Sequence, residues 1–113
     1  MEFLMKDLSP TGNDIGICVS FRFYAKSYDW NAVPTSFGLK ISIKNSADTM
    51  LIKVPVSIGN LKATDLKNEL LKNDVAGVRF KNLKIWTYQH TNKRTKEQKT
   101  IYTGTADDFE IIY

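Results

Sequence analysis

Five stretches of this chain alternate apolar and polar residues, and this period-two pattern most limits the folds that the chain can adopt. Such alternation is typical of a β-strand that buries one face and exposes the other. It predicts strands over about residues 15–28, 37–44, 50–58, 78–88 and 100–113. A chain of 113 residues has room for one domain around one core, so we expect all five strands to share that core.

One parity of each expected strand is apolar, and we expect it to face the core. These positions are Ile17, Val19, Phe21 and Phe23, then Phe37, Leu39, Ile41 and Ile43, then Ile52, Val54, Val56 and Ile58. In the last stretch Phe109, Ile111 and Tyr113 share a face. The opposite parity of the first strand carries Cys18, Ser20, Arg22, Tyr24, Lys26 and Tyr28. Pro55 lies on the outer parity and has no N–H group, which favours an edge or a bulge at that point.

A single helix is predicted between the third and fourth strands. Thr64 is suited to cap its N-terminus, and Asp65 would lie in its first turn. Leu66, Leu70 and Leu71 give one narrow apolar face. We expect this helix to end near Asn73.

The fourth strand changes phase part-way along, which leaves two interpretations. A bulge near Lys81–Asn82 would turn Leu83 and Ile85 toward the core and Trp86 and Tyr88 outward. Without the bulge the two aromatic residues would be core and the two aliphatic residues exposed. The bulge is favoured because it buries both aliphatic side chains.

The predicted order is three strands, one helix and two strands, with a possible interruption of the last strand at Ala106–Asp108. This order is that of the OB-fold, a five-stranded Greek-key barrel that binds oligonucleotides. We therefore expect a mostly-β OB-fold barrel over residues 15–113, with one short helix between strands three and four. Residues 1–14 are expected to form an N-terminal leader. A small open roll and an SH3-like barrel are the alternatives, but both usually lack a helix at that position.

Positive charge and aromatic residues coincide in this pattern. The net charge is +4, and four bases with one acid lie between His90 and Lys99. Non-specific binding of a single strand needs cations for the phosphates and aromatic faces for the bases. The candidate binding residues are Arg22, Tyr24, Lys26, Tyr28, Trp30, Lys53, Lys84, Trp86, Tyr88, Lys93, Arg94, Lys96 and Lys99. The simpler interpretation is that each lysine is solvated, as we expect for Lys40 and Lys44, and that each aromatic residue packs in the core.

The region from Leu51 to Ile112 resembles the single-stranded DNA-binding proteins of bacteria and phages that have an OB-fold. The segments that carry the resemblance are LIKVPVSI, ATDLKNELLKN, VAGVRFKNLKIWTYQ, HTNKRTKEQKT and IYTGTADDFEII. Many bacterial members end in a long tail with an acidic tip that recruits other proteins. Here the last expected strand runs to Tyr113, so the resemblance is closer to a compact phage or mobile-element binder.

Other classes of function find little support in the sequence. His90 is the only histidine and Cys18 the only cysteine, so no intramolecular disulfide or Cys-based zinc site is expected. Asp107 and Asp108 are adjacent in a strand and would point to opposite faces, which makes a poor catalytic pair. A Gly-rich phosphate loop is also missing. We expect no enzyme activity, no catalytic residues, no metal and no cofactor.

The sequence thus predicts a cytoplasmic, largely sequence-independent single-stranded DNA-binding protein with no membrane association. A phage or plasmid accessory module that binds a host protein is the first alternative, because exposed aromatic and basic residues also suit protein interfaces. An RNA-binding OB domain is the second. A homodimer or higher oligomer is compatible with the sequence.

Overall fold

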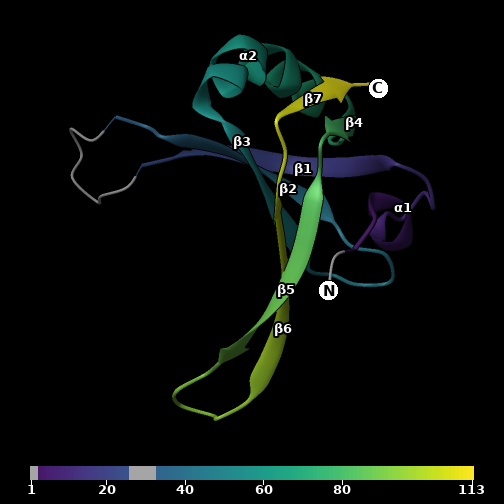
Figure 1. The fold of residues 1–113 in the computed structure, drawn as a ribbon. Helices are drawn as coiled ribbons and strands as arrows, with labels where there is room; N and C mark the ends of the chain where they lie inside the picture. The colour runs from purple at the N-terminus through teal and green to yellow at the C-terminus, as the bar shows by residue number, and fades with distance from the viewer. Residues whose placement is uncertain (1–2, 26–32) are drawn as a thin grey trace.

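The computed structural model describes residues 3–25 and 33–113, and the fold is mostly β. The helices and strands of the described residues follow in the order α1, β1, β2, β3, α2, β4, β5, β6 and β7 (Figure 1). The strands are β1 (Ile15–Tyr24), β2 (Ser36–Ser42), β3 (Thr49–Pro55), β4 (Ala76–Lys81), β5 (Lys84–Thr91), β6 (Gln98–Thr105) and β7 (Asp108–Ile111). The helices are α1 (Met5–Leu8) and α2 (Val56–Asn73).

All seven strands form one sheet in the order β5-β6-β3-β2-β1-β4-β7. Among the strand pairs of the described chain, β3 and β6 are the one parallel pair. The expected helix between the third and fourth strands is present, but the expected closed barrel of five strands is wrong. The predicted strand over residues 78–88 is divided into β4 and β5. The predicted strand over residues 100–113 is divided into β6 and β7. Their first and second halves pair at opposite ends of the sheet, which stays open.

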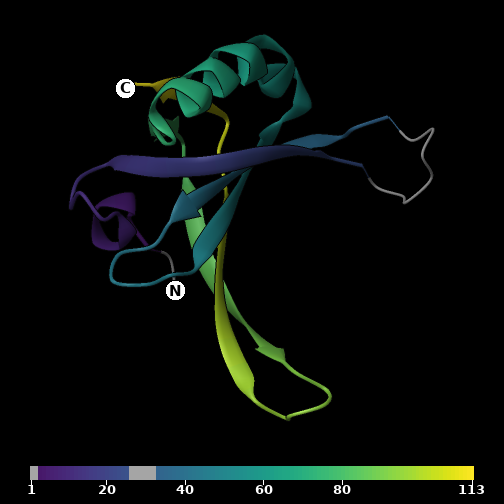
Figure 2. The same cartoon turned by 180° about the vertical axis from the view of Figure 1, so that it is seen from behind.

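The core lies between one face of the sheet and α2, with Phe37 at its centre. The Phe37 ring lies 4.9 Å from Phe23, 5.3 Å from Phe21 and 6.2 Å from Phe109, measured between ring centroids. A Cβ atom at Gly59 of α2 would lie 2.5 Å from Phe37 Cγ, so the helix backbone rests directly on this ring. Figure 2 shows α2 across one end of the sheet, while β5 and β6 extend beyond the other.

The inward residues of β2 agree with the sequence, whereas those after Val54 do not. Phe37, Leu39, Ile41 and Ile43 are all buried as predicted. The helix begins at Val56 rather than at Thr64, so Val56 and Ile58 belong to α2 and not to a strand. Pro55 precedes the first helical residue, with φ −56°. Proline favours a helix start because its lack of an N–H has no cost there.

The C-terminus of α2 agrees with the sequence. The helix ends at Asn73, as predicted, and Asp74 follows in the left-handed region with φ 66°. The Asp74 N–H donates to the Leu70 carbonyl oxygen at 2.9 Å, which is a typical way to satisfy a terminal carbonyl group.

A bulge in β1 inverts part of the predicted pattern. The pairing of β1 with β2 shifts register between Cys18 and Ser20. As a result Cys18 is buried and Val19 is exposed, which is the reverse of the prediction. Beyond the bulge, Phe21 and Phe23 pack against the core as predicted. A bulge adds one residue to one strand, so the faces exchange from that point.

The predicted phase change in the fourth strand is confirmed as a break between β4 and β5. Asn82 has φ 54°, in the left-handed region, and it directly follows the end of β4. Ile85 is then fully buried, whereas Trp86 and Tyr88 are 39% and 51% exposed. Both aromatic side chains therefore face away from the core.

The two ends of the described chain also pack against the sheet. Met5 and Leu8 of α1 are buried in the core, and the Phe3 N–H donates to the Ile85 carbonyl oxygen at 3.0 Å. Tyr113 is 51% exposed. Its ring lies across Gly77, where a Cβ atom would come within 2.7 Å of it.

An ion pair joins α2 to the edge strand β7. Lys62 Nζ donates to Asp108 Oδ1 at 2.8 Å and to the Phe109 carbonyl oxygen, and it lies 5.3 Å from the Phe109 ring centroid. The hydrogen bond from Lys62 lowers the pKa of Asp108 below its ordinary value, and the Phe109 N–H adds a second hydrogen bond. The ionised form of Asp108 is therefore more stable in the folded chain than in the unfolded chain.

We expect Lys62→Met to lower the free energy of unfolding by about 1 kcal/mol near neutral pH. The Asp108 contribution is complete above the ordinary carboxyl pKa of 3.8 and is lost as the pH falls through the lower, folded pKa. The difference between wild type and variant should therefore narrow in strong acid. Urea unfolding near neutral pH and in strong acid measures the difference in unfolding free energy between wild type and variant. The exposed Lys67→Met is the control. An equal difference at both pH values would contradict this account.

Candidate nucleic-acid interface

The pairing registers bring the basic residues of distant strands onto one face of the sheet. Residues that pair across neighbouring strands project to the same side. Four successive pairings therefore form one row across β1, β2, β3, β6 and β5, which consists of Arg22, Gly38, Lys53, Thr105 and Lys84. Three of the predicted phosphate contacts thus lie in a single line.

The neighbouring rows add the aromatic residues. The row beside the first consists of Ser20, Lys40, Leu51, Thr103 and Trp86. The next position along β5 on this face is Tyr88, which pairs with Ile101. On the other side of the first row, Tyr24 pairs with Ser36, which pairs with Pro55. We name the outward residues of these rows the basic face.

Lys40 belongs to the basic face, although the sequence interpretation treated it as an ordinary solvated lysine. It stands beside Leu51 in the row that ends at Trp86. Its parity in β2 marked it as outward. Only the strand order shows that this outward side is also the side of Trp86. The sequence therefore predicted that Lys40 is exposed but not that it lies on the same face as Trp86.

The Tyr24 ring lies over Gly38 and close to two cations. A Cβ atom at Gly38 would lie 2.6 Å from Tyr24 Cε2, so the ring occupies the space that a side chain would fill. Arg22 Cζ lies 5.5 Å and Lys53 Nζ 5.3 Å from the ring centroid. These are cation–π distances, which fix the two charges beside an aromatic surface.

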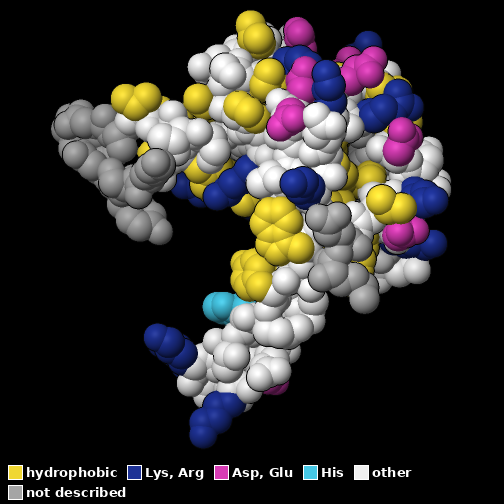
Figure 3. Space-filling view, viewed as in Figure 1, with side chains coloured by type: hydrophobic (Ala, Val, Ile, Leu, Met, Phe, Trp, Pro, Cys, Tyr) yellow, Lys and Arg dark blue, Asp and Glu magenta, His cyan; other side chains and the backbone are white. Residues whose placement is uncertain are grey.

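The hairpin of β5, β6 and the turn between them projects from the body, and we call it the arm. Every residue from Gln89 to Thr100 is exposed, so this part of the arm has no core of its own. Figure 3 shows hydrophobic side chains where the arm leaves the body and Lys or Arg side chains toward its far end. Trp86 and Tyr88 lie in the part of β5 nearer the body.

The turn at the end of the arm presents three of the predicted cations. Asn92 Oδ1 accepts a hydrogen bond from the Arg94 N–H at 2.9 Å, and the Asn92 carbonyl oxygen accepts one from the Lys96 N–H at 2.7 Å. The exposed residues Lys93, Arg94 and Lys96 surround this ordered turn. Lys99 differs, because its Nζ pairs with Asp48 Oδ1 at 3.1 Å and is partly neutralised.

The charge of the basic face is all of one sign along the strands that form it. None of the five strands β1, β2, β3, β5 and β6 contains Asp or Glu. Repulsion of phosphates by carboxylates is therefore limited to the connecting turns, such as the one that carries Asp48. The predicted residues Lys26, Tyr28 and Trp30 lie outside the described residues.

Other kinds of site are not apparent in residues 3–25 and 33–113. No group of three or more His, Cys, Asp and Glu side chains in that part of the chain could hold a metal ion. No helix there is long and apolar enough to cross a membrane. His90 is exposed on the arm and pairs across the strands with Lys99.

Cys18 is buried at the β1 bulge, where its Sγ donates to the Ser20 carbonyl oxygen at 3.2 Å. Burial raises the pKa of this thiol to about 12. Because the thiolate is the reactive form, we expect no reaction of the folded protein with an aromatic disulfide reagent near pH 8. Complete reaction should follow in denaturant, as absorbance of the released thiol would show. Rapid labelling of the folded protein would contradict the buried placement.

Searches of protein-family models, of curated proteins and of solved structures found no match. The function therefore has to be inferred from the residues of this chain and their arrangement.

Proposed function

We propose that this protein binds single-stranded nucleic acid, with DNA as the preferred form, across the basic face and along the arm. The observation that carries the proposal is the shared row of Arg22, Lys53 and Lys84, which has Trp86 in the next row. Cations in a line can follow a phosphate backbone, and the aromatic side chain beside them can stack on a base.

The exposed aromatic side chains favour a single strand over a duplex. Bases in a duplex are stacked on each other, so the faces of Trp86 and Tyr88 would find no free base to stack on. In a single strand the bases are available, and each stacking contact is worth about 1–3 kcal/mol. The row of cations alone would serve either form.

The order of elements supports a relationship to single-stranded DNA-binding proteins. Three strands and then a helix follow each other as in the OB-fold, which binds oligonucleotides on its second and third strands, whereas the four strands β4 to β7 after the helix replace the two of that fold. Here β2 and β3 contribute Lys40 and Lys53 to the basic face. In our proposal the chain uses this order in an open sheet.

The proposal is tested by titrating an unlabelled thymidine oligonucleotide of about 16 nucleotides, near the upper site size of one such fold. The protein should carry Trp30→Phe, so that Trp86 is the only tryptophan and its fluorescence reports the basic face. We expect quenching at low salt. If three phosphates are neutralised, the logarithm of the binding constant should fall with that of salt concentration with a slope of about −2.

Three comparisons distinguish the outcomes. A duplex of the same length should bind more weakly, and an RNA oligonucleotide of the same sequence should bind no better than DNA. Tighter binding of RNA would change the ligand class to RNA. Absence of quenching and of a gel shift at low salt would refute nucleic-acid binding altogether.

A further inference from the structure

A cleft opens where β3 and β6 separate, next to Ile101, the residue that pairs with Tyr88 at the border of the basic face. The two strands pair only from Leu51 to Lys53 and from Thr103 to Thr105. β3 begins earlier, at Thr49, and β6 begins at Gln98, so both continue beyond the paired part. The pocket there lies between β6 and the β2–β3 connection up to Thr49, and its volume of about 430 Å³ is within the range of ligand sites in proteins.

The side of β6 that faces this cleft is a free strand edge. No strand in the described chain pairs with that side from Gln98 to Tyr102. The Ala106 N–H donates to the Lys53 carbonyl oxygen, so it points toward β3. Backbone groups alternate in direction along a strand, so those of Tyr102 and Thr100 also point toward the cleft. A free edge of this kind can accept an added strand.

We propose that this cleft is a second binding site, which takes an extended acidic peptide of a partner protein as a strand on the free edge of β6. A peptide suits the cleft better than a nucleic acid, because the edge offers backbone donors and acceptors in strand register. This proposal names a ligand and a contact that differ from those of nucleic-acid binding, but it shares the cations of the arm with that function.

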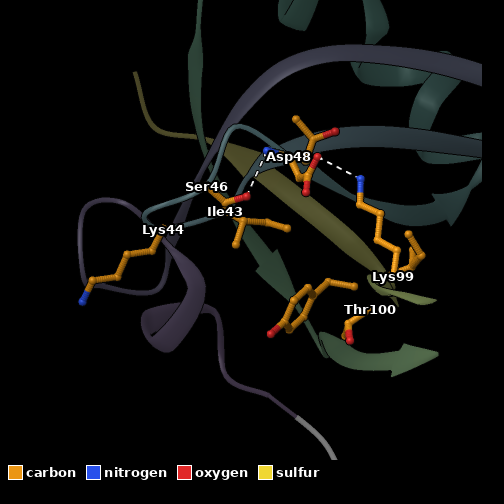
Figure 4. A pocket seen from close by; sticks show the side chains of 9 residues that line it. Ile43, Lys44, Ser46, Asp48, Lys99 and Thr100 are labelled. Atoms are coloured by element: carbon orange, nitrogen blue, oxygen red, sulfur yellow. Dashed lines mark hydrogen bonds and ion pairs between the residues drawn. The ribbon is translucent and has the colours of Figure 1, made fainter. Parts of the chain in front are cut away.

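The charge around the free edge selects for acidic side chains. The edge starts next to the end of the arm, where Lys93, Arg94 and Lys96 accompany a single acid, Glu97. Lys99 lies within the edge itself, and Asp48 is the only acid among the residues that line the cleft. Figure 4 shows Lys44 directed away from the cleft and Lys99 in the cleft, paired with Asp48.

The cross-strand neighbours predict the pattern of the peptide. A peptide residue opposite Lys99 would be acidic, and one opposite Ile101 on the same face would be aliphatic or β-branched. On the other face the half-buried Tyr102 and the buried Ile43 favour aliphatic side chains. The expected ligand therefore carries carboxylates beside the arm and aliphatic residues beside the body.

The Asp48–Lys99 ion pair must exchange when such a peptide binds. Its nitrogen–oxygen distance is 3.1 Å, and both side chains are more than half exposed, so it is inexpensive to break. A peptide carboxylate would take the place of Asp48 on Lys99. Asp48→Asn removes that competitor, and we expect it to strengthen peptide binding up to about 5-fold.

The test uses a synthetic octapeptide in which Glu or Asp alternates with Val or Ile, added to ¹⁵N-labelled full-length protein. We expect chemical-shift changes and at least about tenfold slower hydrogen exchange for the amides of Thr100 and Tyr102. The same peptide with alternate backbone amides N-methylated should have no effect. A peptide with Lys in place of its acidic residues should bind at least tenfold more weakly.

Thr100→Pro tests the same backbone contact by changing the protein instead of the peptide. It removes one N–H that faces the cleft and leaves the hydrogen bonds between β5 and β6 in place. We expect loss of peptide binding, with urea unfolding of the variant as the measurement that shows it is still folded. If this variant does not fold, the N-methylated peptide still decides the question.

Three results would overturn the proposal. The acidic peptide could leave Thr100 and Tyr102 unprotected, or its N-methylated form could protect them equally well. The oligonucleotide could protect these amides in place of the peptide, which would make the cleft part of the basic face. Protection that grows with protein concentration alone would assign the free edge to a second copy of this chain.

Discussion

Trp86→Ala should weaken oligonucleotide binding by about 5-fold to 150-fold, the equivalent of one stacking contact worth 1–3 kcal/mol. Trp86 is 39% exposed and stands beside Thr103 and Leu51 in the row next to the cations. The loss should persist at high salt, because stacking does not depend on counterion release. Fluorescence anisotropy of a labelled oligonucleotide at two salt concentrations measures it.

Two further variants separate stacking from structural damage. Trp86→Phe keeps an aromatic face and should retain most of the affinity. Leu71→Ala removes a side chain that is 74% exposed on α2, away from the basic face, and should not change binding. If Trp86→Ala binds like wild type while Lys53→Glu does not, the interface is electrostatic and the stacking role is wrong.

Phe37→Ala should lower the free energy of unfolding by about 3–5 kcal/mol, a large part of the 5–15 kcal/mol that a domain typically has. Phe37 is fully buried and its ring contacts those of Phe21, Phe23 and Phe109. Removing it leaves a cavity between β2 and α2. Urea unfolding measures the change, and Leu61→Ala on the exposed side of α2 should stay within about 0.5 kcal/mol of wild type.

A double-mutant cycle with Gly59 tests the contact itself. Gly59→Ala alone should cost about 1–3 kcal/mol, because its methyl group would overlap the Phe37 ring. In the Phe37→Ala background the same change meets no ring, and alanine stabilises a helix by about 1 kcal/mol relative to glycine. The effect of Gly59→Ala should therefore change sign. Equal effects in both backgrounds would contradict the packing of α2 on Phe37.

Alternation along the chain predicted the strands well because it depends on which face of each strand is buried. The inward residues of β2 follow directly from it. The phase change before Leu83 correctly indicated that Trp86 and Tyr88 face outward, since no other arrangement buries both Leu83 and Ile85. The same kind of reasoning failed at Val19, because one extra residue in a bulge exchanges the faces without leaving a mark in the pattern.

The start of α2 shows a second limit of sequence reasoning. Val56, Ser57 and Ile58 alternate like a strand, and glycine at position 59 lowers the expectation of a helix. The structure places them in α2, which rests on Phe37 at Gly59, where a side chain would overlap the ring. That contact joins residues from distant parts of the chain, so local preference could not reveal it.

The sequence by itself determined that this is a mostly-β chain with one longer helix after the third strand, and that its cations and outward aromatic residues are interleaved. The tertiary structure alone decided that the sheet stays open, that Arg22, Lys53 and Lys84 share one row, and that β6 keeps a free edge. The physical reason is the range of the interactions. Burial of one face is recorded residue by residue along a strand, whereas register and strand order depend on pairing between segments that only folding brings together.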